Sequence, residues 1–408
     1  MSKSYSQAVK NRLKNFVKKT VPYRIHLQPC GTIAPEDLAA REGAAKVNYL
    51  RVYEDYETIL PLPVELSDNL STFACYDEVH SRPDGHKYLA YRDSYEVVSI
   101  SGGRLSSNNM SNISIITDQN EIVERVSYQY RVDRRASASE NDLFQQRYFT
   151  EPEYIDGTVA TLLAGHGATH NVSHWLYDSI PRIHLLMEAG VFDEIDYFVV
   201  PAYNTEYHEY TLGRFGIDKS KVIPGSRDMH LVAKRLVATS HPRGNRSFIL
   251  PTWVYEFIRS SYLDTQEDGS GQRKRIYISR KDSGYRGIIN EAEVESLLKK
   301  YGFESVVLSE LSMGDQVTLF SSAEIVVSAS GAGLSKLFFA PHDCAVIELF
   351  STGFVHTAFY NVAYLGGLNY KALVTDVDNP ASTMAAGQRE SFAVDIDKLK
   401  TALDGFLS

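Results

Sequence analysis

The last third of the chain alternates short apolar runs with segments in which apolar residues recur every three or four positions. Runs of this length predict buried strands, and the recurrence predicts helices. The predicted strands cover residues 275–280, 304–308, 324–329 and 345–350, and the predicted helices cover residues 290–302, 312–323, 333–340 and 395–407. Strands that alternate with helices over short links predict a parallel, doubly wound α/β sheet.

Two of these helices begin with residues suited to capping. Asn290 stands three positions before Glu293, and Ser312 stands three positions before Asp315. This spacing predicts that each pair caps the start of its helix.

The pattern before residue 160 is different. Residues 85–150 alternate apolar and polar positions, with turn residues at 118–120, which predicts an antiparallel β layer. Further on, residues 172–190 have helical spacing and contain Pro181, which predicts a kink or a division into two helices. Strands at 158–164, 195–201 and 235–240 and a helix at 206–216 complete the predicted elements of this half.

A turn-rich break at residues 241–245 suggests where the chain divides. We therefore expect a β-rich plus α/β domain over residues 25–243 and a Rossmann-like domain over 244–385. Residues 1–24 and 386–408 are expected to be a basic N-terminal segment and a C-terminal helix. In open α/β sheets ligands bind beyond the carboxyl ends of the strands, so that edge is where chemistry is expected.

Composition narrows the function classes. The 408 residues include 42 Lys and Arg against 51 Asp and Glu, a net charge of −9, which argues against a nucleic-acid binder. Cys30, Cys75 and Cys344 are far apart, so neither a disulfide framework nor a cysteine zinc site is expected, and a reducing, cytoplasmic setting is favoured. Neither a membrane-spanning run nor the apolar core of a signal peptide is recognisable.

The N-terminal segment, residues 1–24, contains only basic charges and has apolar residues at helical spacing. A basic amphipathic helix can lie on an anionic membrane, which predicts a peripheral location at the inner face of the cell membrane. The alternative is a solvated helix packed on the body of the protein.

Residues 330–333, Ser-Gly-Ala-Gly, link a buried strand to the next helix. Glycines let a backbone approach a ligand closely, and free N–H groups at a helix start attract phosphate. The alternative is an ordinary tight turn, because Lys336 stands where a dinucleotide fingerprint would have its third glycine.

Three charged residues leave strands at the same predicted edge. Arg280 ends one strand and Arg286 follows it, and guanidinium groups suit diphosphate oxygens. Glu348 lies near the end of a later strand, where a carboxylate can accept two ribose hydroxyls or cap a loop N–H. Together these residues predict a nucleotide-diphosphate pocket.

Histidines cluster between residues 166 and 178. His170, His174 and Asp178 are four apart, which places them on one face of any helix. The spacing also suits zinc, but the glutamate of the HExxH motif is missing, so a general base is favoured over a metal site. A packing and capping cluster is the remaining alternative.

Asp376 and Asp378 form an Asp-x-Asp motif after a predicted strand. Too little chain follows for the acceptor site that a manganese-dependent enzyme builds there, so we interpret this segment as a loop.

In this order and spacing, residues 90–375 resemble the family 61 glycosyltransferases. The matching elements are Ser279-Arg280, Arg286, Asn290-Glu291, Gly302-Phe303, Asp315-Gln316, Leu319-Phe320, Gly331 to Leu334 and Glu348, with Asn171, His174, Trp175, Asp178 and Pro181 upstream. The family's turn usually opens with histidine, where this chain has Ser330, so donor identity or transfer rate is expected to differ.

The resemblance implies a GT-B-like fold, in which two Rossmann-like domains face each other across a cleft. It also implies inverting transfer from a UDP-sugar to a glycan, without a metal or other cofactor, in capsular or other surface polysaccharide synthesis. The implied donor site comprises Arg280, Arg286, Ser330, Gly331, Ala332, Gly333, Leu334 and Glu348.

For the general base, Asp178 is preferred over His174, and His170, Asn171 and Trp175 are assigned to the acceptor side or cleft. Two other functions are weighed. One is a sugar-binding scaffold without activity, with which Ser330 is consistent. The other is an NAD-dependent oxidoreductase, which Gly331 disfavours because it lies so late in the chain.

Overall fold

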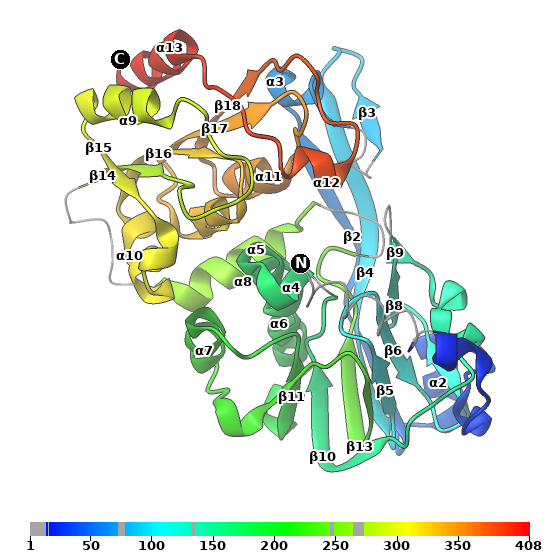
Figure 1. The fold of residues 1–408 in the computed structure, drawn as a ribbon. Helices are drawn as coiled ribbons and strands as arrows, with labels where there is room; N and C mark the ends of the chain where they lie inside the picture. Colours follow the sequence, from blue (N-terminus) through cyan, green and yellow to red (C-terminus); the bar gives the residue numbers. More distant parts are fainter. Residues whose placement is uncertain are drawn as a thin grey trace.

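The structure is a computed structural model that describes residues 14, 16–71, 78–131, 135–165, 167–244, 249–263 and 273–408 (Figure 1). Its strands form two sheets, one between residues 31 and 239 and the other between residues 274 and 375. The α/β class predicted from the sequence is confirmed. The finer GT-B arrangement and the domain boundaries stay predictions.

Among the described residues, the first sheet has thirteen strands. They are β1 (Gly31–Ile33), β2 (Val47–Pro61), β3 (Val79–Ser81), β4 (Lys87–Ser101), β5 (Arg104–Ser107), β6 (Asn112–Ile116), β7 (Glu121–Val123), β8 (Tyr128–Tyr130), β9 (Arg135–Ala136), β10 (Glu153–Thr161), β11 (Tyr197–Val200), β12 (Val222–Pro224) and β13 (Met229–Thr239). The main path is β1-β7-β6-β5-β13-β10-β11-β12, and β4 pairs with β13, β2 and β3. Most of these strands lie in the lower part of Figure 1, and β2, β3 and β4 reach up its right-hand side.

The two kinds of pairing in this sheet follow the sequence pattern. Strands β4, β5, β6, β8 and β9 pair antiparallel, as the alternation over residues 85–150 predicts. Strands β10, β11 and β12 pair in parallel, and β13 pairs in parallel with β10. Asn120, in the predicted turn, has a left-handed backbone with φ 60°.

Helices cover the parallel half of this sheet. They are α4 (Gly167–His170), α5 (Val172–His174), the π-helical turn η4 (Trp175–Ser179), α6 (Pro181–Glu188), α7 (Glu206–Gly213) and α8 (Thr252–Tyr262). Pro181 is the first residue of α6, so the predicted division at this proline is confirmed. Smaller helices are η1 (Ile25–Leu27), α2 (Pro35–Glu42), α3 (Val64–Ser67), η2 (Ala138–Glu140), η3 (Asp142–Gln145), η5 (Phe192–Glu194) and η6 (Lys219–Lys221).

The second sheet is parallel and has the order β15-β14-β16-β17-β18. Its strands are β14 (Lys274–Ile278), β15 (Phe303–Val306), β16 (Ala323–Ala329), β17 (Ala345–Ser351) and β18 (Asn369–Thr375). In sequence order this is 2-1-3-4-5, so the direction of winding reverses between β14 and β16. Ligands of doubly wound folds bind at such a reversal, beyond the carboxyl ends of the strands.

Helices pack on both faces of the second sheet. They are α9 (Glu291–Lys300), η7 (Leu308–Glu310), α10 (Met313–Ser321), η8 (Ala332–Phe339), α11 (Ala358–Leu365), α12 (Met384–Gly387) and α13 (Ile396–Leu407). Alternate residues of β16 face opposite layers: Val327 packs in the cluster that contains α9 and α13, and Val326 in the cluster that contains α10 and η8. Burial on both faces explains why these strands are continuously apolar.

Of the two predicted helix caps, the one at α10 is confirmed and the one at α9 is not. Ser312 accepts a hydrogen bond from the Asp315 N–H, as predicted. The prediction for Asn290 is wrong, because its side chain makes no cap bond and instead accepts from the Val394 N–H at 2.8 Å. Tertiary contact with the chain before α13 has replaced the local cap.

Strands β2 and β4 form a long arm that connects the two sheets, visible on the right of Figure 1. Leu60 and Leu89 of the arm pack with Phe350 and Ala372 of the second sheet. The Tyr360 hydroxyl also donates to the Pro61 carbonyl at 2.7 Å. The arm therefore packs against β17 and β18 of the second sheet and against α11.

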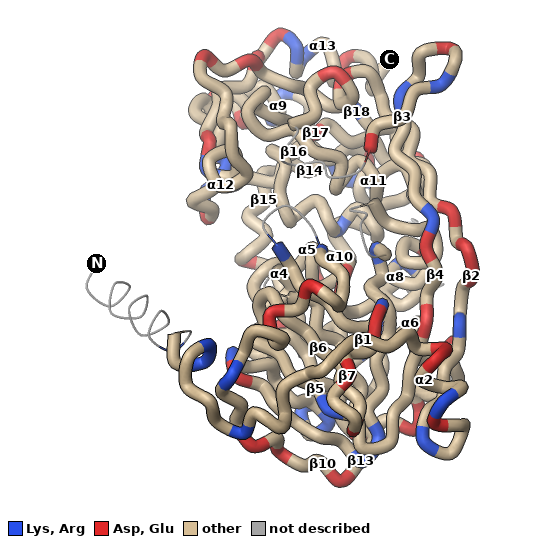
Figure 2. The backbone as a smooth tube through the Cα atoms, turned by 90° about the vertical axis from the view of Figure 1, so that its right-hand side faces the viewer, with Lys and Arg blue, Asp and Glu red and all other residues tan. Residues whose placement is uncertain are grey.

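Most of the predicted basic N-terminal segment lies outside the described residues. In the part that is described, residues 16–20 are helical, and Lys14 and Lys18 form ion pairs with Asp228. Arg24 forms an ion pair with Glu151, and Phe16 is exposed. Basic and acidic residues are interspersed over the described chain (Figure 2), and none of its helices is long and apolar enough to cross a bilayer.

Candidate functional site

Predicted ligand-binding residues meet where the second sheet reverses its winding. Arg280 follows β14 and Gly331 follows the neighbouring strand β16. A Cβ atom built on Gly331 would lie 1.8 Å from Arg280 Nη1, so the guanidinium group rests against the bare glycine. Only glycine leaves space for this approach. The structure thus brings together two residues that are far apart in sequence.

Arg286 lies beside Arg280 and Gly331, and its guanidinium group is affected by burial as that of Arg280 is. Its Nε atom donates to the Ser330 carbonyl at 2.7 Å, while Arg280 donates to the Tyr285 carbonyl and the Ser283 hydroxyl. Neither arginine forms an ion pair with a described residue. Burial lowers the pKa of both, and the charge of Arg280 helps to lower the pKa of Arg286 to about 10.

Two adjacent cations that form no ion pair with a described residue favour an anionic ligand, and helix η8 adds to this preference. Its eight residues begin at Ala332, and no side chain caps its start. Both Ala332 and Gly333 are partly exposed, so their backbone can be approached. The positive end of the helix dipole and the two guanidinium groups therefore all favour the binding of an anion here.

Ser330 and Glu348 lie beneath this surface. Their exposed fractions are 1% and 0%, so the ribose contact proposed for Glu348 is not open to solvent. Tyr370 donates to Glu348 Oε2 at 2.6 Å, and Oε1 has no hydrogen-bond partner. Burial raises the pKa of Glu348 to about 7, against the effects of Ser330, Tyr370 and Arg286. Leu334 is also fully buried and belongs to the core.

A second cluster surrounds Asp178 in η4. Arg243 donates to both carboxylate oxygens of Asp178, each at 2.7 Å, and His174 Nδ1 lies 2.8 Å from Oδ2. Burial alone would raise the pKa of Asp178, but the charge of Arg243, with His174 and His241, holds it well below the usual range. Asp178 is 2% exposed and both its oxygens are engaged.

His174 is the member of this cluster that solvent can reach. Its side chain is 39% exposed, and donation from Nδ1 to Asp178 leaves the lone pair on Nε2. Gly167 packs against its ring, because a Cβ atom there would lie 2.7 Å from His174 Cγ. The arrangement orients a histidine so that Nε2 can accept a proton.

The other described residues predicted for this region have different surroundings from those of Asp178. His170 is exposed at the end of α4, and the next residue is extended, so His170 does not share a helix face with His174. Trp175 was expected near the cleft, but it is fully buried and donates to Thr211. Asn171 caps α5 by accepting from the Ser173 N–H. His166 lies outside the described residues.

Sequence reasoning missed Arg243, because residues 241–245 were interpreted as a domain boundary. A turn signal describes the local backbone and says nothing of the distant carboxylate that the side chain meets. His356 and Tyr370 were also missed, and no motif marks them. Asp376 and Asp378 are exposed in the loop after β18, so their interpretation as a loop is confirmed.

Tyr177 connects the two clusters. Its ring lies 5.9 Å from the Arg243 guanidinium carbon and 5.6 Å from the ring of Phe338 in η8. Its hydroxyl is buried without a hydrogen-bond partner. Tyr177 therefore packs between the Asp178 cluster and η8, the helix that begins at the anion site.

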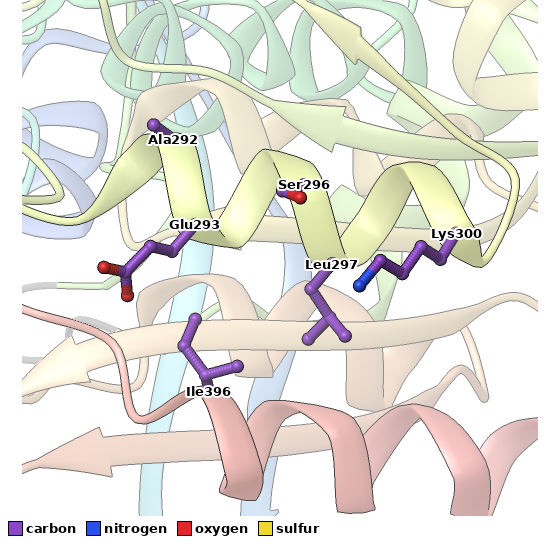
Figure 3. Close-up of a pocket in the computed structure, with 6 residues that line it drawn as sticks. All are labelled: Ala292, Glu293, Ser296, Leu297, Lys300 and Ile396. Carbon is purple, nitrogen blue, oxygen red and sulfur yellow. The ribbon is translucent and has the colours of Figure 1, made fainter.

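A separate open groove lies between α9 and α13 (Figure 3). It is lined by Ala292, Glu293, Ser296, Leu297, Lys300 and Ile396. None of these residues belongs to the two clusters, so the groove is not part of the candidate site.

Residues 172–347 match the family model for Glycosyltransferase 61. This span runs from just before His174 to the residue before Glu348. Residues 172–347 are therefore similar in sequence to the glycosyltransferase 61 family. The matched span thus includes Asp178, Arg243, both arginines of the anion site and the glycine turn.

Curated relatives match part of this chain. It is 32% identical over 111 residues to the EGF domain-specific O-linked N-acetylglucosamine transferase of Bos taurus, covering 26% of this chain and 21% of that protein. It is 30% identical over 106 residues to the alpha-1,3-arabinosyltransferase XAT3 of Oryza sativa subsp. japonica, covering 24% and 18%. The matches span about a fifth of the length of these relatives.

Proposed function

We propose that this protein is a glycosyltransferase that moves a sugar from a nucleotide-sugar, UDP-linked, to a hydroxyl group of a glycan. The observation that supports this most directly is the pair of arginines, Arg280 and Arg286, beside the open start of η8 at the sheet reversal. The diphosphate group of a nucleoside diphosphate is negatively charged, so it can form the ion pairs that the two arginines do not make within the described chain. The match to the glycosyltransferase 61 model, and relatives whose names specify sugar transfer, support the same activity.

The proposed reaction is a single displacement with inversion. The acceptor oxygen attacks the anomeric carbon, the bond from that carbon to the diphosphate oxygen breaks, and the nucleoside diphosphate leaves with the bonding pair. Arg280, Arg286 and the backbone N–H groups at the start of η8 stabilise the charge that develops on the leaving group. Preorganised charges of this kind are usually the largest contribution to such catalysis.

His174 is our preferred general base, in place of Asp178. Asp178 is buried and both its oxygens bind Arg243, whereas His174 is partly exposed and has a free acceptor atom in Nε2. In this scheme Asp178 orients the ring and stabilises the imidazolium that forms when the acceptor hydroxyl loses its proton.

The remaining parts of the proposal rest on the sequence and the resemblance. They are transfer without a metal, a polysaccharide acceptor as in capsule synthesis, a cytoplasmic location and contact of residues 1–24 with an anionic membrane. The ion pairs of Lys14, Lys18 and Arg24 with the body of the protein reduce the basic charge available for that contact.

Nucleotide binding and nucleotide release test the function separately. Calorimetry with UDP, GDP and CMP measures binding, and release of nucleotide from a panel of their sugars measures turnover. We expect UDP to bind, and His174→Ala to lower kcat at least 100-fold with UDP binding retained, since a general base contributes about 10²–10⁴-fold. His86→Ala, at an exposed histidine of the β3–β4 turn, is the matched control.

Three outcomes would count against the proposal. Binding without release of nucleotide would favour the scaffold. Failure to bind any nucleotide would remove the donor site. A His174→Ala variant that retains full turnover would remove the base.

A further inference from the structure

His356 lies between β17 and α11 and contacts the turn that opens η8. Its Nε2 atom is 3.1 Å from the Ser330 hydroxyl oxygen, and its Nδ1 atom is 3.3 Å from the Ala358 backbone nitrogen. A backbone N–H can only donate, so Nδ1 is the acceptor and the ring proton is on Nε2. His356 therefore donates a hydrogen bond to Ser330.

The His356 ring is held in this form and place. Burial, reinforced by the charge of Arg286, lowers its pKa to about 3, so the ring is neutral at working pH. The rings of Phe350, Phe354 and Phe359 pack edge-on around it, with centroids 5.8, 5.0 and 5.7 Å away. The ring cannot move without repacking these rings, and the Ala358 N–H fixes its tautomer.

Arg286 contacts the same two neighbours as His356. It donates to the Ser330 carbonyl, and its guanidinium carbon lies 5.4 Å from the centroid of Phe354. His356, Ser330, Arg286 and Phe354 thus form a closed set of contacts, in which Ser330 is held through its hydroxyl by one residue and through its carbonyl by another. Arg286 has φ 53°, a left-handed conformation that persists only where neighbours hold it.

We propose that His356 is a positioning residue of the donor site. It fixes Ser330, and Ser330 in turn holds Arg286 in the orientation that binds the diphosphate. The inference rests on the proposed function, because it concerns how the same site holds its ligand. The two residues are 26 positions apart, which explains why no motif contains both.

Four variants separate the hydrogen bond from the packing of the ring. His356→Phe keeps an aromatic ring in the phenylalanine cage and removes the N–H, while His356→Gln restores a donor. Ser330→Ala removes the other partner, and the double variant completes the cycle. His342→Phe is the matched control, because it removes a histidine contact to the Gly366 carbonyl at the opposite end of β17.

We expect His356→Phe and Ser330→Ala each to raise the Kd for UDP about tenfold, and the double variant to be no weaker than either. His356→Gln should stay within about threefold of the wild type, and His342→Phe should bind as the wild type does. An unchanged Kd in His356→Phe, a folded His356→Gln that binds no better than His356→Phe, or additive losses in the double variant would each overturn the inference. If His356→Phe does not fold, Ser330→Ala provides the same test.

The double-mutant cycle of His356→Phe and Ser330→Ala can also be measured on the free energy of unfolding without nucleotide. This measurement distinguishes a failure of the proposed function from a failure of the positioning role. If wild-type protein binds neither UDP nor pyrophosphate, the proposed function fails, and with it the positioning role. Non-additive stability would then show that the contact between His356 and Ser330 is real, and additive stability would overturn that as well.

Discussion

Asp178 and Glu348 are both buried carboxyl groups, and their different partners shift their pKa values in opposite directions. Asp178 receives two hydrogen bonds from Arg243, which keeps it ionised although it is buried. Glu348 has a hydroxyl partner on one oxygen and none on the other, and burial therefore dominates. Burial raises a carboxyl pKa unless nearby cations and hydrogen bonds compensate. At Glu348 the charge of Arg286 and the hydrogen bonds lower the pKa too little to offset burial.

Replacing Glu348 with Gln should change how stability depends on pH. With a folded pKa of about 7, against an ordinary value of 4.5, the folded protein binds more protons than the unfolded chain between these limits. The wild type therefore loses stability as pH rises from 4.5 to 7, and Glu348→Gln does not. At pH 8 we expect the variant to be about 2–3 kcal/mol more stable to urea, with the difference gone near pH 4.5.

Glu310→Gln, at an exposed position, is the control and should show no such difference. A Glu348→Gln variant that is less stable than the wild type at pH 8 would contradict this account of Glu348.

At the scale of elements, two glycines set how closely neighbouring segments approach. Gly331 lets the Arg280 guanidinium lie over the start of η8, and Gly167 lets the start of α4 pack on the ring of His174. Neither glycine has φ in the left-handed region, so each is required for space and not for its backbone conformation.

Gly331→Ala should weaken nucleotide binding. The added methyl group overlaps Arg280 Nη1, so the guanidinium has to move away from the start of η8. We expect the Kd for UDP to rise at least tenfold, which is about 1.4 kcal/mol, while thermal stability changes little because the end of an arginine side chain is flexible. Gly284 lies in the loop that also contains Arg280, and a Cβ atom there would have open space around it. Gly284→Ala should therefore bind UDP as the wild type does.

Gly167→Ala should act on turnover and leave donor binding intact. Its methyl group would displace the His174 ring from Asp178, so we expect kcat to fall about tenfold or more with an unchanged Kd for UDP. Gly213→Ala, at the end of α7, has no atoms within 4 Å of the new methyl group and provides the control. A weaker Kd with unchanged kcat would place His174 in the donor site instead.

At the scale of the whole molecule, one apolar core joins the two sheets. The largest cluster of buried residues contains Phe198 and Val237 from the first sheet together with Val326 and Val346 from the second. The arm formed by β2 and β4 adds a separate apolar contact, where Leu60 meets Phe350. Both contacts link the parts of the chain on which the Asp178 cluster and the anion site lie.

This shared core predicts that the two sheets unfold together. Calorimetric heating should show one transition, because neither sheet can lose its structure without exposing the core of the other. Two resolved transitions would contradict it. Tyr360→Phe, which removes the hydrogen bond to Pro61, should lower the free energy of unfolding by about 1 kcal/mol and keep the single transition.

Much of the second sheet, and some of the helices on the first, could be predicted from the sequence. Strand and helix periods, the division at Pro181, the cap at Ser312 and the glycine turn after β16 depend on residues within one or two turns of each other. The order of matching residues also indicated the family whose model matches residues 172–347. Arg280, Arg286 and Gly331 were correctly grouped, because parallel strands end at one edge of a sheet whatever their order.

Only the tertiary structure decided which of these residues face solvent and which pair with distant partners. It buried Ser330, Glu348 and Trp175, and it placed Arg243 on Asp178 across 65 positions of sequence. Burial and ion pairing depend on how the sheets, the arm and the helices pack around a side chain, and no local pattern records that packing. The sequence by itself therefore determined the elements and the chemistry available at their ends, and packing assigned each group to the surface, the core or a partner.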